Sequence, residues 1–269
     1  MAGNTKALRV RIKSVTSTLQ LTKAMGLVAS SKIRRANEAM NKGRQYSEVL
    51  DKTISTLTAD RECAKSPYMQ KREPHRTRLV VIAGDRGLAG GYNANIFRLC
   101  ATFKDTEFVP IGKRACERFG YPIVSSERFS FDDAVELADK LCTDFAEGKF
   151  DRLGIVSTRY VSVMTQEAFV KWVLPLEKSD RADTAGMVFE PDRLTVLNNV
   201  VREYVAGMIT LSVRESFASE VAARRMAMDS AGKNAKEMID NLQLEYNRAR
   251  QGAITQEITE IVAGSGNQL

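Results

Sequence analysis

The placement of proline divides this chain of 269 residues into a middle part and two long ends. All six prolines lie between Pro67 and Pro191, so the first 66 residues and the last 78 contain none. Proline breaks the interior of a helix because it lacks an N–H and clashes with the preceding turn. Each end can therefore form one very long helix. Trp172 and most of the phenylalanines lie in the middle, which predicts a compact core there.

The first 58 residues carry a heptad pattern. Apolar or small residues recur at alternating steps of four and three from Leu8 to Leu57. This spacing, kept over about seven heptads, predicts the buried seam of a coiled coil. The middle of the seam is small, with Thr22, Gly26 and Ala29, so a partner helix can approach closely there.

A matching stripe runs from Ala218 to Ala253 and is interrupted by Arg225. The next apolar positions are out of phase with it: Ile254, Ile258 and Ile261. Such a shift indicates either a local change of supercoiling or the point near Ala253 where the second helix leaves its partner and continues alone. At about 1.5 Å per residue, the two helices would be on the order of 80 and 100 Å long. We expect them to protrude as an antiparallel pair, because the chain leaves and returns through one central domain.

The middle of the chain alternates β-branched runs with amphipathic segments. The predicted strands are Arg78–Ala83, Glu107–Ile111, Pro122–Ser125, Arg152–Thr158 and Ala168–Leu174. The predicted helices are Ala94–Phe103, Lys113–Phe119 and Phe131–Glu147. Because strands that alternate with helices form parallel sheets, we predict a parallel sheet with helices on its faces.

The predicted fold class is therefore α/β, with a long antiparallel coiled coil of the terminal helices and a central parallel-sheet domain. The predicted parts are an N-terminal helix at residues 1–58, a linker at 59–76, the sheet domain at 77–198 and a C-terminal helix at 199–269. We expect His75 to lie in the linker.

The positive charge is concentrated at the N-terminal end. Residues 1–73 hold 15 basic and 6 acidic side chains, whereas the rest of the chain is close to neutral. Such a basic arm suggests a nucleic acid, an anionic membrane surface or an acidic protein as partner, and a solvated helix face is the alternative. The arm lacks interleaved aromatic residues for stacking on bases, which argues against binding to single strands. No apolar run is long enough to span a membrane, and no apolar segment resembles a secretion signal.

A glycine-rich segment, Gly84–Asn93, follows the first predicted strand, where a phosphate-binding loop would stand. Its spacing fits neither GxGxxG nor GxxxxGK[ST], so a glycine-rich turn is favoured over nucleotide binding. In that case we expect Asp85 and Arg86 to form a local charge pair.

The chain offers little for catalysis. His75 is its single histidine, and the four cysteines form no CxxC pair: Cys63, Cys100, Cys116 and Cys142. We therefore expect reduced thiols and no metal site. We also expect no cofactor and no catalytic residues, because the chain has no GxSxG motif.

Three segments carry a specific pattern. Residues 21–36 read LTKAMGLVASSKIRRA, residues 84–93 read GDRGLAGGYN, and residues 245–264 read EYNRARQGAITQEITEIVAG. Together they closely resemble the gamma subunit of F-type ATP synthase. The resemblance spans both ends and the centre, and it implies two long antiparallel helices beside a small Rossmann-like domain.

The resemblance implies a non-catalytic rotor shaft. In that family the coiled coil fills the centre of a ring of alternating alpha and beta subunits, and ATP is made on beta. The globular domain forms a foot with the epsilon subunit on the membrane c-ring, and proton flow turns the ring and the shaft. One copy per complex is implied, with no nucleic acid and no direct membrane insertion. The expected location is the cytoplasmic face of a bacterial inner membrane.

Single positions can be carried over from the family to this sequence. The resemblance implies beta-subunit contacts at Lys23, Met25, Arg250, Gln251, Thr255 and Glu257. It implies contacts with the c-ring or epsilon foot at Phe189, Glu190 and Asp192. Two alternatives remain open at this point: a nucleotide-binding α/β protein that uses residues 84–91, and a basic coiled-coil protein that binds nucleic acid or acts as a scaffold.

Overall fold

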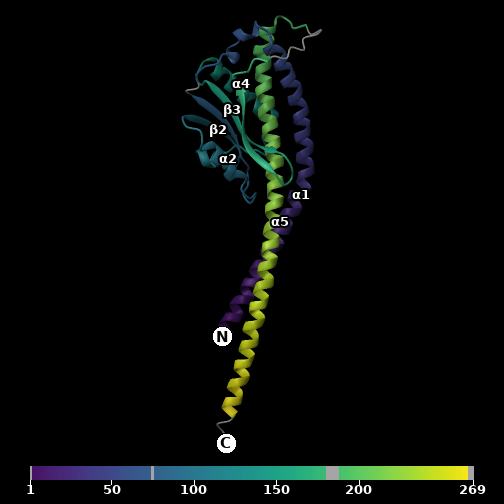
Figure 1. Cartoon of the computed structure of the whole chain (residues 1–269), viewed down its shortest axis with the longest axis vertical. Helices are drawn as coiled ribbons and strands as arrows, with labels where there is room; N and C mark the ends of the chain where they lie inside the picture. Colours follow the sequence, from purple (N-terminus) through teal and green to yellow (C-terminus); the bar gives the residue numbers. More distant parts are fainter. Residues whose placement is uncertain (1, 74–75, 180–187, 266–269) are drawn as a thin grey trace. The chain divides into compact units, whose positions relative to one another are not determined.

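A computed structural model describes residues 2–73, 76–179 and 188–265 (Figure 1). His75 lies outside these residues. The helices and strands, in chain order, are α1 (Ala2–Thr58), β1 (Thr77–Ile82), α2 (Tyr92–Cys100), β2 (Thr106–Ile111), α3 (Lys113–Phe119), α4 (Phe131–Ala146), β3 (Arg152–Tyr160), β4 (Gln166–Leu174) and α5 (Arg193–Ser265). Two short 3-10 helices, Cys63–Lys65 and Pro67–Met69, lie between α1 and β1.

The chain forms two compact units. The first is built from residues up to Val28 and from Arg225 onward, and the second is Ala29–Arg224. The boundaries predicted at residues 58, 76 and 198 all fall inside the second unit, so that division stays a prediction. Each unit is described below by itself.

In the first unit, α1 and α5 pair along the predicted seam. A Cβ on Gly26 would lie 3.7 Å from Met228 Cβ, and one on Gly232 would lie 3.6 Å from Thr22 Oγ1. The Arg9 guanidinium donates a hydrogen bond of 2.7 Å to the hydroxyl of Tyr246. In these three contacts the residue numbers on α5 increase as the residue numbers on α1 decrease, which confirms the antiparallel pairing.

The seam residues are buried as the heptad pattern predicts. Every predicted seam position from Leu8 to Leu57 is buried or half-buried, while Leu21 and Leu27, which lie off the seam, are 64% and 72% exposed. The pattern also located the seam in the second unit, where Met40 and Ala218 belong to one buried cluster.

The second unit contains a four-stranded sheet in the order β2-β1-β3-β4. Strand β1 pairs in parallel with β2 and with β3, as predicted. The prediction of an all-parallel sheet is wrong for β4, which is antiparallel to β3. The reason is the connection: residues 161–165 are too few for a crossover, which needs about a dozen, and they close a hairpin instead.

The predicted strand Pro122–Ser125 is also wrong, because this segment forms no strand. It follows β2, which is an edge strand of the sheet and contains Pro110, a residue without an N–H to donate. Instead, the carbonyl of Val124 accepts a hydrogen bond of 3.0 Å from the N–H of Gly112.

The two faces of the sheet bury different layers. In β1, Val80 and Ile82 face a core shared with α4, the end of α1 and the first turns of α5. The alternate residues Leu79 and Val81 face a second core shared with α2 and α3. This alternation with period two places helices on both faces, as in other α/β folds.

Several residues of the segment between α1 and β1 are buried against the rest of the second unit. Cys63 is fully buried and Tyr68 is 4% exposed. Arg72 donates a hydrogen bond of 3.0 Å to the carbonyl of Phe145, and its guanidinium lies 5.1 Å from the ring centroid of the same residue. The last helix begins at Arg193, six residues before the predicted start at 199.

Candidate partner-binding surfaces

The first candidate surface lies on α1 in the first unit. Lys23 is exposed and Met25 is half-buried. The seam residues Thr22 and Gly26 face α5. At about 100° per residue, Lys23 and Met25 therefore lie on opposite flanks of the seam. A partner that met the side of α1 that carries Lys23 would find a cation beside the exposed apolar side chain of Leu27, four residues further along.

The second candidate surface is the end of α5. Arg250, Gln251, Thr255 and Glu257 are all exposed. The Thr255 hydroxyl donates to the carbonyl of Gln251 over 3.0 Å, a contact within the helix that leaves both carboxamide and guanidinium groups facing outward. These side chains are therefore available to a partner.

Beyond Ala253 the apolar residues of α5 no longer continue the seam, and they are more exposed than the seam residues before them. Ala253 is half-buried, but Ile254, Ile258 and Ile261 are 43%, 56% and 70% exposed. This confirms that α5 continues beyond its contact with α1. Apolar side chains on an unpaired helix end mark a surface that another protein covers.

The third candidate surface precedes α5 in the second unit. Glu190 is exposed, and Phe189 is half-buried with the Arg193 guanidinium 5.5 Å from its ring centroid. Asp192 caps the helix: it accepts hydrogen bonds of 2.8 Å from both the N–H and the hydroxyl of Thr195. These bonds, the backbone one first, lower the pKa of Asp192. Its carboxylate thus has a structural role besides any contact with a partner.

The glycine-rich segment packs against α5. A Cβ on Gly84 would lie 2.7 Å from the carboxyl carbon of Glu220, so a larger residue there would displace this carboxylate. Glu220 is 3% exposed and forms an ion pair with Arg224, which also donates to the carbonyl of Gly87 over 3.3 Å. Burial raises the pKa of Glu220, and Arg224 opposes that shift. The space where a phosphate would approach Gly84 is filled by a carboxylate.

Asp85 does not pair with Arg86, contrary to our expectation. Its carboxylate accepts hydrogen bonds from the hydroxyl of Ser125 and from the N–H groups of Ser126 and Lys113, the latter two over 2.9 and 3.0 Å. Burial alone would raise the pKa of Asp85, but these bonds outweigh it and the pKa is lowered. Asp85 therefore ties the loop after α3 to the N-terminus of α3, where an external anion would otherwise bind.

Sequence reasoning missed Glu220, Arg224 and the partners of Asp85. Glu220 and Arg224 lie one turn apart within the apolar stripe on α5. The heptad pattern continues through them, so it gave no sign that they form a buried ion pair. The sequence signal for this pair is an acidic and a basic residue four positions apart on one helix, since side chains at this spacing can form an ion pair.

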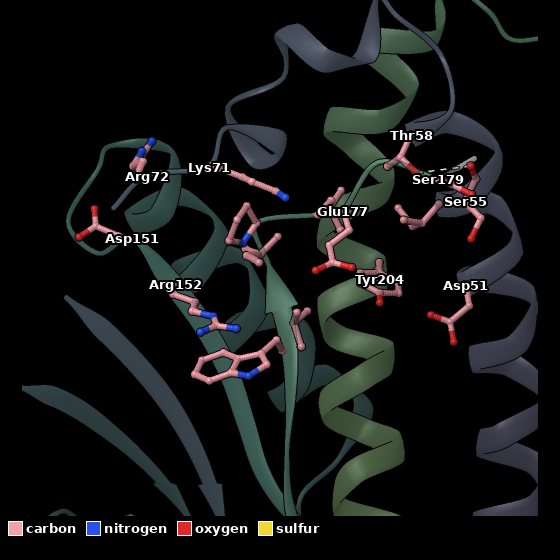
Figure 2. Close-up of a pocket in the computed structure, with 16 residues that line it drawn as sticks. Asp51, Ser55, Thr58, Lys71, Arg72, Asp151, Arg152, Glu177, Ser179 and Tyr204 are labelled. Atoms are coloured by element: carbon pink, nitrogen blue, oxygen red, sulfur yellow. Dashed lines mark hydrogen bonds between the residues drawn. The ribbon is translucent and has the colours of Figure 1, made fainter. Parts of the chain in front are cut away.

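A cavity of about 430 Å³ lies between β4, the end of α1 and α5 (Figure 2). Lys71, Arg152 and Glu177 reach it from three separate segments, and the Arg152 guanidinium lies 3.4 Å from the ring centroid of Trp172. Its three basic residues are matched by three acidic ones: Lys71, Arg72 and Arg152 against Asp51, Asp151 and Glu177. The cavity therefore has no net charge that would select an anion.

Within the described residues, no cluster of three His, Cys, Asp or Glu side chains could hold a metal ion. None of the helices in that part of the chain is both long and apolar enough to cross a membrane.

The comparisons with known proteins agree across the whole chain. A family model described as ATP synthase matches residues 4–266. The ATP synthase gamma chain of Ruminococcus albus is 41% identical over 284 aligned positions, which cover 98% of this chain and 99% of the relative. The chain belongs to the ATP synthase gamma chain family. The resemblance carried by the three sequence segments is thus confirmed.

Solved structures share the gamma-chain fold. The rotor of the Euglena gracilis mitochondrial ATP synthase matches with a TM-score of 0.71 and 19% identity, over 94% of this chain and all of that one. A central-stalk chain from the Tetrahymena thermophila mitochondrial ATP synthase matches with a TM-score of 0.61 and 21% identity, over 78% of this chain and 99% of that one. At this level of identity the likeness supports the fold: two long helices beside a mixed α/β sheet unit.

Proposed function

We propose that this chain is the central rotor shaft of a proton-translocating ATP synthase. The observation that carries the proposal is the end of α5, where Arg250 and Gln251 are exposed just before Ala253 and three isoleucines are exposed beyond it. A helix end of this kind needs a surrounding protein to cover it. In the gamma chain family, that protein is a ring of alternating alpha and beta subunits.

In this role the chain itself performs no catalysis, and ATP is made on the beta subunits of the ring. The beta subunits meet the shaft at Lys23 and Met25 on α1 and at Arg250, Gln251, Thr255 and Glu257 on α5. The surplus of nine positive charges in residues 1–73 attracts acidic loops of the ring. One copy serves each complex.

The other end of the shaft sits with the epsilon subunit on the membrane c-ring. Phe189, Glu190 and Asp192 contribute to this contact, which transmits the rotation that proton flow produces. Asp192 supports it indirectly, because its cap fixes the start of α5. The complex lies on the cytoplasmic face of a bacterial inner membrane.

Reconstitution tests the proposal. A complex that lacks its own gamma chain, supplied with this chain in membrane vesicles, should regain ATP-driven proton pumping, and the chain should co-purify with alpha and beta. Omission of the chain is the control. Recovery of the chain with nucleic acid and without alpha and beta would instead support the scaffold alternative, and tight binding of ATP or NAD to the purified chain would support the nucleotide-binding one.

A further inference from the structure

The carboxyl ends of β1 and β3 meet at the switch point of the sheet. From β1 the chain crosses to β2 on one side and then returns to β3 on the other side, which gives the order β2-β1-β3-β4. In open α/β sheets, ligands bind outside the strand ends at such a point. Here this place is occupied by the chain itself, through the segment Glu215–Arg224 of α5.

Polar side chains of α5 take over the hydrogen bonds of β3 where β1 ends. Strand β3 pairs with β1 as far as Val156, but it continues to Tyr160. The N–H of Thr158 donates to the hydroxyl of Ser216 over 3.2 Å, and the hydroxyl of Ser219 donates to the carbonyl of Thr158 over 3.3 Å. Helix α5 therefore completes the edge of this strand as a neighbouring strand would.

An ion pair adds α1 to this contact. The N–H of Tyr160 donates to the carboxylate of Glu215 in α5 over 3.2 Å, and the Arg44 guanidinium in α1 binds the same oxygen over 2.6 Å. Arg44 also donates to the carbonyl of Tyr160 over 3.3 Å. Further along α5, the pair of Glu220 and Arg224 holds the glycine-rich segment after β1. Both long helices are thus bonded to the same corner of the sheet.

The polar groups of α5 in this contact are buried, and their bonds have a direction. Glu215, Ser216, Ser219 and Glu220 are 9%, 1%, 0% and 3% exposed. The hydrophobic effect is non-directional, so apolar packing alone lets a helix roll against its neighbours. Hydrogen bonds weaken steeply as their angle changes, and a buried polar group that loses its partner is costly. The contact therefore fixes the rotation of α5 about its own axis relative to the sheet.

We propose that this contact, which we call the β3 joint, is where the sheet passes torque to α5. The joint consists of Glu215–Arg224 with the ends of β1 and β3 and with Arg44. The inference rests on the proposed function, in which torque reaches α5 from the rest of the second unit. Because α5 is one helix from Arg193 to Ser265, torque received at the joint is carried along it. The place that holds a ligand in other α/β proteins holds α5 here.

Removal of two hydroxyl groups tests the joint. In the complex assembled in vesicles, Ser216→Ala/Ser219→Ala should hydrolyse ATP like wild type when no proton gradient opposes it. Against a steep gradient, the number of protons pumped per ATP should fall by about threefold or more, because each lost bond favours the open joint by roughly fivefold. Thr210→Ala is the control, since its buried hydroxyl donates within α5, to the carbonyl of Ala206 over 2.8 Å. Wild-type pumping by the double variant, or an equal loss in the control, would overturn the inference.

A second pair of variants covers the case in which the double variant does not fold. Arg44→Gln removes the ion pair with Glu215, and Arg202→Gln removes a similarly exposed ion pair between α5 and α4, with Asp139 over 3.1 Å. Only Arg44→Gln should lower pumping against the gradient, and equal pumping by the two variants would overturn the inference. Circular dichroism checks that both retain their helices. If the unmodified chain does not assemble with alpha and beta, the proposed function itself fails, and the two failures are thereby distinguished.

Discussion

At the scale of single residues, close backbone contacts fix the turn between β2 and α3. Gly112 has a φ of 99°, and a Cβ there would lie 1.9 Å from the carbonyl oxygen of Ala83. We expect Gly112→Ala to lower the free energy of unfolding by roughly 4 kcal/mol, because the backbone oxygen cannot yield as a side chain would. Urea unfolding followed by the fluorescence of Trp172 measures this.

Gly120 provides the matched control for that substitution. Its φ is 74°, but a Cβ at this position would have no atom within 4 Å of it. Gly120→Ala should therefore cost only about 1 kcal/mol, which is the strain of a left-handed conformation for alanine. Equal losses for the two variants would show that the contact with Ala83 is unimportant.

Asp85 makes stability depend on pH in a defined direction. Its pKa is lowered below the ordinary 3.8 by hydrogen bonds to its charged form. A carboxylate of this kind stabilises the fold fully above its ordinary pKa, and that stability is lost as the pH falls toward the lowered pKa. We expect Asp85→Asn to lower the free energy of unfolding by about 2 kcal/mol at pH 7. The variant should also lose less stability than the wild type as the pH falls below about 4.

Urea midpoints of wild type and Asp85→Asn at pH 7 and at pH 3.5 measure this effect. Asp105→Asn removes an exposed carboxylate of the same unit and serves as the control. If the two variants lost stability in parallel with wild type down to pH 3.5, the bonds to Ser125 and its neighbours would not be the cause.

Met25 tests the surface of α1 that we assign to the beta contact. Met25→Lys should impair coupling more than ATP hydrolysis, because an added ammonium pairs with an acidic group of beta at some rotor angles and not at others. The interaction energy between the shaft and the ring would then vary with the rotor angle by about 1–3 kcal/mol for a partly desolvated pair. The number of protons pumped per ATP hydrolysed measures coupling. A wild-type value in the variant would show that Met25 does not face beta. Gln20→Lys, on an exposed position of the same helix, is a charge-matched comparison.

At the scale of elements, the contact with the ring that we propose for the end of α5 can be tested at Arg250 and Gln251. Replacing both Arg250 and Gln251 by Ala should cost about 2–4 kcal/mol of interaction, on the scale of two charge-assisted hydrogen bonds. We expect weaker assembly or lower ATP synthesis with helix content unchanged. The same double substitution at Lys236 and Glu237, exposed on the paired part of α5, should have little effect. Full synthesis in the Arg250/Gln251 variant would mean that these side chains are merely solvated.

The elements with a regular apolar period were predicted best from the sequence. The heptads located the seam of α1 residue by residue, because a helix pair buries the same positions at every turn. Strand β4 was identified, but its direction was not, since an apolar run does not encode direction and the short link 161–165 was overlooked. The segment after β2 has the composition of a strand, but Pro110 leaves that edge unable to pair fully.

The candidate site residues were less predictable than the fold. Sequence resemblance supplied Arg250 and its neighbours, and their exposure agrees with a contact without testing it. Glu220 and Arg224 were found only in the structure, because their pairing depends on how closely Gly84 approaches α5.

At the scale of the whole molecule, the purified chain should show no ATPase activity. Its glycine-rich segment faces the carboxylate of Glu220 rather than an open phosphate site, and its sequence contains no P-loop motif. A coupled phosphate-release assay on a preparation free of beta measures this, and the reconstituted complex is the positive control. Turnover by the beta-free chain would contradict a purely mechanical role.

The glycines of the helix pair have an elastic consequence. Around Gly26 and Gly232 the two helices approach closely, with little side-chain volume between them. The resistance of a rod to bending rises steeply with its thickness, so we infer that this slender stretch bends more easily than a stretch whose seam residues are larger. A shaft with one compliant stretch stores part of each turning step as elastic strain and returns it later, which smooths the transfer of torque between a stepping ring and a steadily driven rotor.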